Sequence, residues 1–119
     1  SLAVSIERLQ LRECRERSTL CVDLALHLRL TDATSGAVRL DERLAYTSGY
    51  PDGVDPFKAG PRLYERSVAP YSRCTALADW CSTDGPQLLA EEIERGLGAL
   101  AAQFARDLDA APAVTGLAP

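Results

Sequence analysis

The sequence predicts an α+β fold, in which an antiparallel β-meander of three to four strands carries a long C-terminal helix on one face. Two observations predict it. Apolar residues alternate with a period of two over residues 20–31, which is typical of a half-buried antiparallel strand. Apolar residues recur every three or four positions over residues 84–112, which is typical of an amphipathic helix. Strands followed by a helix, rather than alternating with helices, favour the α+β class.

The central strand, residues 20–31, has the clearest pattern in the chain. One face of LCVDLALHLRLT carries only apolar residues, namely Val22, Leu24, Leu26, Leu28 and Leu30. A helix would scatter these leucines around its cylinder, so the pattern predicts a strand.

The segment before it, residues 2–12, predicts a strand with a fault in its alternation. Leu2, Val4 and Ile6 share one phase, whereas Leu9 and Leu11 are out of phase by one residue. A slip of one residue would turn the two later leucines to the solvent face. We therefore expect a β-bulge near Glu7 and Arg8, which restores the phase.

Turn and loop signals divide the middle of the chain. Residues 32–36, DATSG, are turn formers, and the period of two resumes from Val38 to Tyr46. Residues 48–61 hold three glycines and three prolines and predict a long loop. Residues 62–69 predict a short edge strand that ends at Pro70.

The C-terminal helix has recognisable ends and an apolar stripe. Asp84 is suited to the cap and Pro86 to the first turn. The stripe contains Leu89, Ile93, Leu97, Leu100, Phe104 and Leu108. Gly96 and Gly98, with nearby alanines, predict a smooth surface for close approach to the sheet. We expect residues 1–111 to form a single domain and residues 112–119 to form a flexible tail.

Composition excludes several partners. The 119 residues, 46% hydrophobic and 25% charged, are ordinary for a soluble globular domain. Thirteen basic against 17 acidic residues give a net charge of −4, which argues against a nucleic-acid partner. No apolar run approaches the roughly 20 residues of a membrane span. We therefore expect no transmembrane segment, and membrane association only through a lipid anchor outside this chain.

The four cysteines lie in two pairs seven positions apart, CRERSTLC at Cys14 and Cys21 and CTALADWC at Cys74 and Cys81. An even count in a small domain favours disulfides and an exported protein over four reduced thiols. The spacing is too loose for a zinc knuckle, which uses C-x2-4-C, and for a C-x-x-C redox pair.

Local pairing is the favoured connectivity. Cys14 and Cys21 are expected to face each other across the first hairpin, within the Cα separation that a disulfide tolerates. A Cys74–Cys81 bond requires CTALADWC to bend, for example as one helical turn before Asp84. Pairing between the two motifs remains the alternative.

No residue set for catalysis, metal binding or a cofactor is expected. His27, the single histidine, lies on the polar face of the central strand as an exposed or bridging residue, without a nucleophile motif nearby. Asp52 and Asp55 are too few for calcium. The candidate interaction residues are the aromatic residues Tyr50, Phe57, Tyr71 and Trp80, although anchoring of loops is the commoner use of so few aromatics.

Three segments resemble small envelope lipoproteins of Gram-negative bacteria. They are LCVDLALHLRLTDATSGAVRLDERLAYTS, YSRCTALADW and LLAEEIERGLGALAAQFARDL. The resemblance covers roughly residues 18–110 and includes the auxiliary lipoproteins of transport systems. Two departures are that Cys14 follows no lipobox and that the cysteine pairs are not general in those families. The resemblance implies an exported protein, in the periplasm or associated with the outer membrane, with a binding or assembly role.

Two functions follow as hypotheses. The first is a non-enzymatic cell-envelope domain that acts through protein contact, as an accessory or assembly subunit or as a homo-oligomer, because one helix covers only part of the predicted sheet. The alternative is a small-ligand binding module that uses the cavity between sheet and helix, with the 48–61 loop as a lid.

Overall fold

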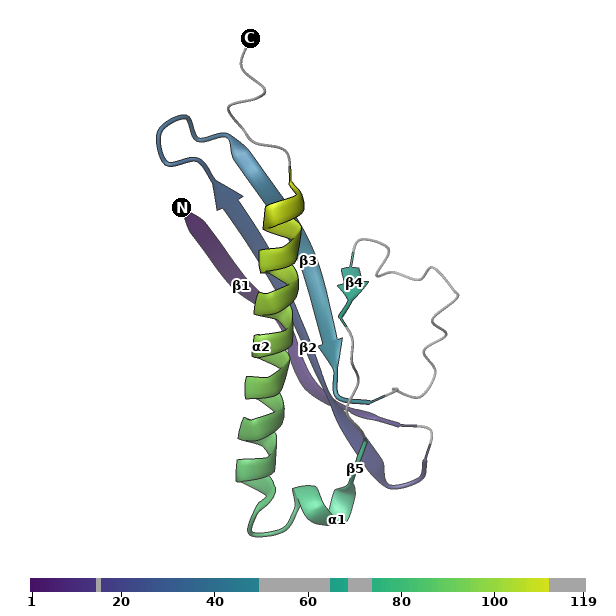
Figure 1. The fold of residues 1–119 in the computed structure, drawn as a ribbon. Helices are drawn as coiled ribbons and strands as arrows, with labels where there is room; N and C mark the ends of the chain where they lie inside the picture. Colours follow the sequence, from purple (N-terminus) through teal and green to yellow (C-terminus); the bar gives the residue numbers. More distant parts are fainter. Residues whose placement is uncertain (15, 50–64, 69–73, 112–119) are drawn as a thin grey trace.

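The computed structural model describes residues 1–14, 16–49, 65–68 and 74–111, and it has an α+β fold of two layers (Figure 1). One layer is a mainly antiparallel sheet in the order β1-β2-β3-β4, with β5 paired to β2. The other is the long helix α2, which packs on β2 and β3. The elements are β1 (Leu2–Glu13), β2 (Thr19–Thr31), β3 (Val38–Thr47), β4 (Glu65–Ser67), β5 (Thr75–Ala76), α1 (Leu77–Trp80) and α2 (Gly85–Ala110).

The first three strands confirm the predicted meander and the bulge. The register of β1 against β2 shifts between Ile6 and Arg8, so that Ile6 lies opposite Leu26 and Leu9 opposite Leu24. Residues directly opposite in an antiparallel pair share a face. The bulge therefore keeps every large apolar residue of β1 on the face of the sheet that α2 packs against.

The turn between β2 and β3 forms as predicted over residues 32–36. The Asp32 carboxylate accepts hydrogen bonds from the backbone N–H groups of Thr34 and Ser35, at 2.8 and 2.9 Å. These two backbone donors, Ser35 first, hold the pKa of Asp32 below its usual value. Gly36 has φ +75°, a left-handed conformation that glycine adopts without a steric cost.

The fourth strand corrects the prediction of a wholly antiparallel sheet. β4 pairs with β3 in the parallel direction, with Leu44 opposite Arg66. Parallel neighbours need a connection of a dozen or more residues, and residues 48–64 are long enough to provide it. β5 adds a two-residue antiparallel pairing to the start of β2. A helical turn, α1, follows it within CTALADWC, although the Cys74–Cys81 bond for which such a turn was expected does not form.

The helix α2 begins and ends close to the predicted positions. Asp84 is the N-cap residue, although its side chain makes no capping hydrogen bond, and Pro86 lies in the first turn. Over the described ranges, neither helix combines the length and hydropathy required to cross a bilayer. The predicted tail, residues 112–119, lies outside the described residues, so its flexibility stays a prediction.

The core lies between α2 and the middle of the sheet. Its buried members are Leu24, Leu26, Leu28, Leu44, Tyr46, Val68, Leu100 and Phe104. On α2 the buried line runs through Glu92, Gly96, Leu100 and Phe104, whereas Leu97 is 43% exposed. The predicted apolar stripe is therefore partly wrong, because the helix turns its glycine, rather than Leu97, toward the Tyr46 ring.

The predicted close approach is correct at Gly96 and wrong at Gly98. A Cβ atom added at Gly96 would lie 2.6 Å from Cδ1 of Tyr46, whereas one added at Gly98 would meet nothing within 4 Å. The Tyr46 hydroxyl donates to the buried Glu92 carboxylate at 3.3 Å, and Arg95 donates to the same carboxylate at 2.5 Å. The polar group at the centre of the helix face is thus satisfied.

Candidate interaction surface

The strand β1 carries a row of exposed apolar side chains, which we call the β1 row. Its members, with their exposed fractions, are Leu2 (52%), Val4 (53%), Ile6 (63%), Leu9 (48%) and Leu11 (41%). Each lies opposite an apolar residue of β2, from Leu30 to Val22. The row therefore continues the apolar face of the sheet beyond the part that α2 covers.

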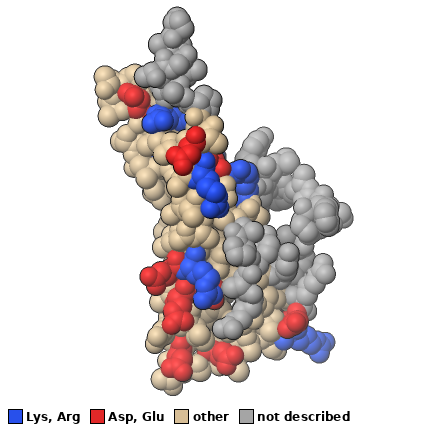
Figure 2. All heavy atoms as spheres, viewed as in Figure 1, with Lys and Arg blue, Asp and Glu red and all other residues tan. Residues whose placement is uncertain are grey.

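The geometry of the two layers explains why the β1 row is exposed. A helix with its side chains is about 10 to 12 Å wide, and neighbouring strands lie about 4.8 Å apart, so one helix covers about two strands. Because α2 packs on β2 and β3, it leaves β1 beside it (Figure 1). In Figure 2, which has the same view, the surface beside the upper part of α2 where β1 lies is largely free of charged atoms.

The opposite face of β1 is polar and is already engaged. Asp23 of β2, whose side chain is fully buried, accepts hydrogen bonds from Nε of Arg8 at 2.7 Å and from Gln10 at 3.0 Å. The Arg12 guanidinium lies 3.5 Å from the same carboxylate. Two cations and an amide thus compensate the buried charge, as burial of a carboxylate requires. The side chains on this face connect β1 to β2. The apolar side chains on the other face, the β1 row, remain exposed.

His27 belongs to this polar face and bridges two carboxylates, in agreement with the predicted role. Its Nε2 lies 2.5 Å from Asp41 and its Nδ1 lies 3.6 Å from Glu7. Arg43 also reaches Glu7, at 3.0 Å. The two residues proposed and rejected as calcium ligands, Asp52 and Asp55, lie outside the described residues.

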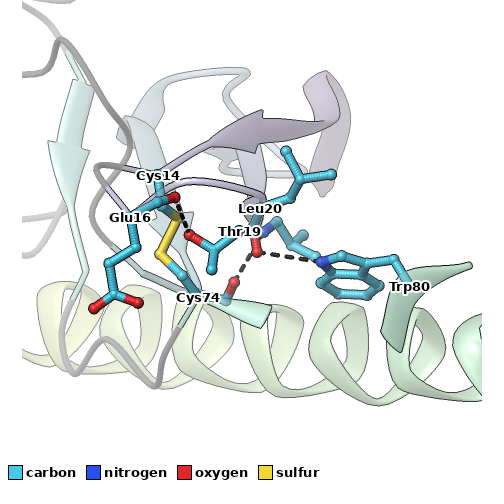
Figure 3. Close-up of a disulfide and its surroundings, with 8 residues drawn as sticks. Cys14, Glu16, Thr19, Leu20, Cys74 and Trp80 are labelled. Carbon is cyan, nitrogen blue, oxygen red and sulfur yellow. Dashed lines mark hydrogen bonds between the residues drawn. A yellow bond between two sulfur atoms is a disulfide. The ribbon is translucent and has the colours of Figure 1, made fainter. Parts of the chain in front are cut away.

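The structure corrects the predicted disulfide pairing. Cys14 is bonded to Cys74, with their Cα atoms 6.4 Å apart, which is the alternative of pairing between the two motifs (Figure 3). Cys21 is a buried free thiol and Cys81 is an exposed one. The local prediction assumes a directly opposed pair, but the hairpin register places Arg12 opposite Cys21, so Cys14 is a diagonal neighbour of Cys21 and bonds to Cys74 instead. Cys14 lies nearer the hairpin end, where its N–H donates to Thr19.

The disulfide and its surroundings hold the chain between β5 and α2 against the hairpin. The Leu77 N–H donates to the Ser18 carbonyl at 2.7 Å. Nε1 of Trp80 donates to the Leu20 carbonyl at 3.3 Å (Figure 3). Trp80 is half-buried and anchors α1, in keeping with the common use of aromatic residues as loop anchors, and it does not belong to the β1 row. The other candidate interaction residues, Tyr50, Phe57 and Tyr71, lie outside the described residues.

A charged cluster joins the last turns of α2 to β3 and β4. Arg66 lies 3.4 Å from Glu42 and also pairs with Asp107. Burial and the neighbouring Asp107 raise the pKa of Glu42 to about 7, against the opposing effect of Arg66. Arg66 pairs with a carboxylate of β3 and with a carboxylate of α2, so this cluster connects the helix to the sheet.

The space between sheet and helix, where the alternative function expects a ligand cavity, is closely packed at Gly96. Tyr46 and Leu24 fill the space against Gly96, at the distances given by close packing. Two hollows of the described surface lie elsewhere, one beside the β1–β2 hairpin and one beside Glu42 and Arg66. The expected lid, residues 48–61, lies outside the described residues from residue 50 onward.

The alternation over residues 2–12 predicts the members of the β1 row as strand residues but does not predict that they form an exposed surface. The one sequence signal for such a surface is that a single helix covers only part of a sheet of this size. No protein-family model, no curated protein and no solved structure matches this chain.

Proposed function

We propose that this chain is a non-enzymatic domain of the bacterial cell envelope that works through protein contact at the β1 row. The observation that carries the proposal is the exposure of this row, whose members follow one another along a single strand. Single exposed leucines are normal, whereas contiguous apolar patches mark sites of interaction. The resemblance to envelope lipoproteins supports the compartment. The Cys14–Cys74 disulfide is compatible with it, because disulfides persist in oxidising environments.

The occupant we propose for the β1 row is a second copy of this chain. Covering the exposed half of each apolar side chain contributes about 1 kcal/mol, or roughly 5 kcal/mol for the row. A two-fold contact in which each row packs on the other counts this gain twice, to about 10 kcal/mol. Against the lower end of the roughly 4 to 15 kcal/mol that association costs, this leaves about 6 kcal/mol, which corresponds to a Kd of about 40 μM. A contact with a partner that has no apolar strand of its own would gain only the free energy from burying one row.

The layer spacing is compatible with such a contact. Sheets pack face to face about 10 Å apart, which is close to the thickness of a helix lying on a sheet. The partner's β1 would therefore lie beside α2 at the height of that helix, over the β1 row. The open edge of β1, which no described strand pairs with, would then face the partner's helix layer.

Mass measurement in solution tests the proposal. At about 100 μM, most of the wild-type chain is expected to have the mass of two chains by light scattering or sedimentation velocity. Ile6→Asp, which introduces a charge at the most exposed position of the row, is expected to have the mass of one chain.

The matched control is Ala3→Asp, which adds the same charge to an exposed position of the same strand, on the polar face opposite Arg29. It is expected to leave the dimer intact. A wild-type chain that remains a monomer at this concentration would exclude the second copy as occupant. A dimer that survives Ile6→Asp but not Ala3→Asp would place the contact on the other face.

A further inference from the structure

Three cysteines, not two, meet at the end of the β1–β2 hairpin. The sulfur atoms of Cys14, Cys21 and Cys74 all lie within 4.8 Å of one another. Cys14 and Cys74 share the disulfide, and Cys21 is a free thiol with no exposed surface. A nucleophilic sulfur is thus enclosed beside a disulfide that it can reach with small side-chain and hairpin movements.

We propose that Cys21 exchanges with this disulfide, so that the fold holds two alternative pairings, Cys14–Cys74 and Cys14–Cys21. The inference stands independently of the proposed function, because it rests on the three sulfur positions alone. In this proposal Cys21 is the alternative disulfide partner of Cys14. Cys74 is the residue that the exchange releases as a free thiol.

The exchange step needs no external oxidant or reductant. When the hairpin end moves enough to admit water, the Cys21 thiol loses its proton to that water, and the thiolate attacks Sγ of Cys14. A new bond forms between the sulfurs of Cys14 and Cys21 while the Cys14–Cys74 bond breaks. The electron pair of the broken bond goes to Sγ of Cys74, which takes up a proton. Cys21 is oxidised and Cys74 is reduced, so the redox balance is unchanged.

The surroundings favour Cys74 as the leaving thiol. Cys74 is half-buried, whereas Cys14 is 6% exposed, so Cys74 has the better access to solvent. Cys14 and Cys21 also lie on one hairpin, which keeps them close after the bond to β5 opens.

The environment of Cys21 makes the exchange slow rather than absent. Burial raises the pKa of the Cys21 thiol, as does the Asp23 carboxylate, against a backbone hydrogen bond from Gly49 and the Arg12 guanidinium. At neutral pH the thiol is therefore mainly protonated. The Cys14–Cys74 bond is the resting pairing, and exchange proceeds through the small thiolate fraction.

The two disulfide pairings differ in which segments of the chain they join covalently. In the resting pairing a covalent bond attaches β5 to the end of β1. In the alternative pairing the bond is internal to the hairpin. The segment that leads to α1 is then held only by noncovalent contacts, which include the Leu77 and Trp80 hydrogen bonds to Ser18 and Leu20.

Trapping of the released thiol tests the proposal in the folded protein. The chain carries Cys81→Ser, which removes the exposed free thiol, and is incubated with iodoacetamide without reductant. After acid quenching and pepsin digestion, mass spectrometry is expected to find alkylated Cys74 together with a peptide pair joined through Cys14 and Cys21. The matched control adds Cys21→Ser and is expected to show at least about tenfold less alkylated Cys74.

A second variant keeps the test independent of the trapping rate. Cys74→Ser in the Cys81→Ser background, folded by circular dichroism and exposed to oxidised glutathione, is expected to form the Cys14–Cys21 bond. The proposal is overturned if the trapped three-cysteine protein keeps only Cys14–Cys74, whether or not Cys21 itself is alkylated. It is also overturned if the folded Cys74→Ser variant leaves Cys14 and Cys21 unbonded to each other.

Discussion

Gly96 sets the distance between α2 and the sheet. The Tyr46 ring lies where a side chain at position 96 would be. One turn earlier on the helix, the buried Glu92 carboxylate accepts a hydrogen bond from the Tyr46 hydroxyl. Gly96 and Glu92 both interrupt the apolar pattern of the helix. The close packing of Gly96 against Tyr46 and Leu24 explains why α2 turns Gly96, rather than Leu97, toward the sheet.

We predict opposite effects of alanine at the two helix glycines. Gly98→Ala should raise the free energy of unfolding by about 1 kcal/mol, because alanine has the higher helix propensity and the site is open. Gly96→Ala should lower it by about 1 to 3 kcal/mol, because the methyl group displaces the Tyr46 ring. Urea denaturation of both variants measures the difference. Equal stabilisation by both would contradict the close approach at Gly96.

Glu42 makes stability depend on pH. Its pKa is raised to about 7 from an ordinary value of 4.5, so the folded chain prefers the protonated carboxyl. The stabilising contribution of the protonated carboxyl is fully present below about pH 4.5 and is lost as pH rises through about 7.

We therefore predict that Glu42→Gln is more stable than wild type at pH 8, by about 1 to 3 kcal/mol, and similar to it near pH 4. Denaturant titrations at several pH values measure this crossover. Glu94→Gln, which neutralises an exposed carboxylate of α2, is the control and should show no comparable gain at pH 8. A difference between Glu42→Gln and wild type that stays constant with pH would refute the prediction.

At the scale of elements, the disulfide compensates for short secondary structure. β5 has two residues and α1 has four, and neither would persist alone. Their attachment to the hairpin combines the Cys14–Cys74 bond, the pairing of β5 with β2 and the Trp80 hydrogen bond. The bond closes a long loop, since its cysteines are 60 residues apart in sequence.

Removal of this bond should cost substantial stability. The double variant Cys14→Ser/Cys74→Ser is expected to lose about 2 to 4 kcal/mol, because loop-closure entropy is restored to the unfolded chain. Cys81→Ser, at an exposed free thiol, should leave the unfolding midpoint unchanged. Thermal or urea unfolding without reductant compares the variants. A double variant as stable as wild type would show that the crosslink contributes little.

Most of these elements could be predicted from the sequence, whereas the disulfide partner of Cys14 could not. Alternation over residues 20–31 predicts β2, and the phase fault near Glu7 predicts the bulge, because both depend only on which face each residue takes. The partner of Cys14 depends on hairpin register and on where β5 returns. A spacing of seven residues carries information on neither.

At the scale of the whole molecule, one helix on a sheet of this width leaves an apolar strip beside it. The β1 row is this strip, and its exposure follows from the number of layers rather than from any unusual residue. The buried Asp23 beneath the polar face of β1 is compensated by contacts within the chain. The contiguous row of exposed apolar side chains therefore lies on the other face of this strand.

If a second copy covers this strip, thermal stability should rise with protein concentration. We predict that the melting temperature of wild type increases by several degrees between about 1 and 100 μM, because mass action favours the bound folded state. Ile6→Asp should melt at one temperature throughout that range, and Ala3→Asp should follow wild type. Differential scanning fluorimetry measures all three. A concentration-independent wild type would argue against association.

The sequence by itself determined the α+β class, the meander with its bulge, the turn at residues 32–36 and the extent of α2. These depend on local periodicity and turn chemistry, which short stretches of residues encode. Only the tertiary structure decided the parallel pairing of β4, the Cys14–Cys74 bond, the rotation of α2 about Gly96 and the exposure of the β1 row. Each of these depends on how segments distant in the chain fill one volume, and no local pattern records that.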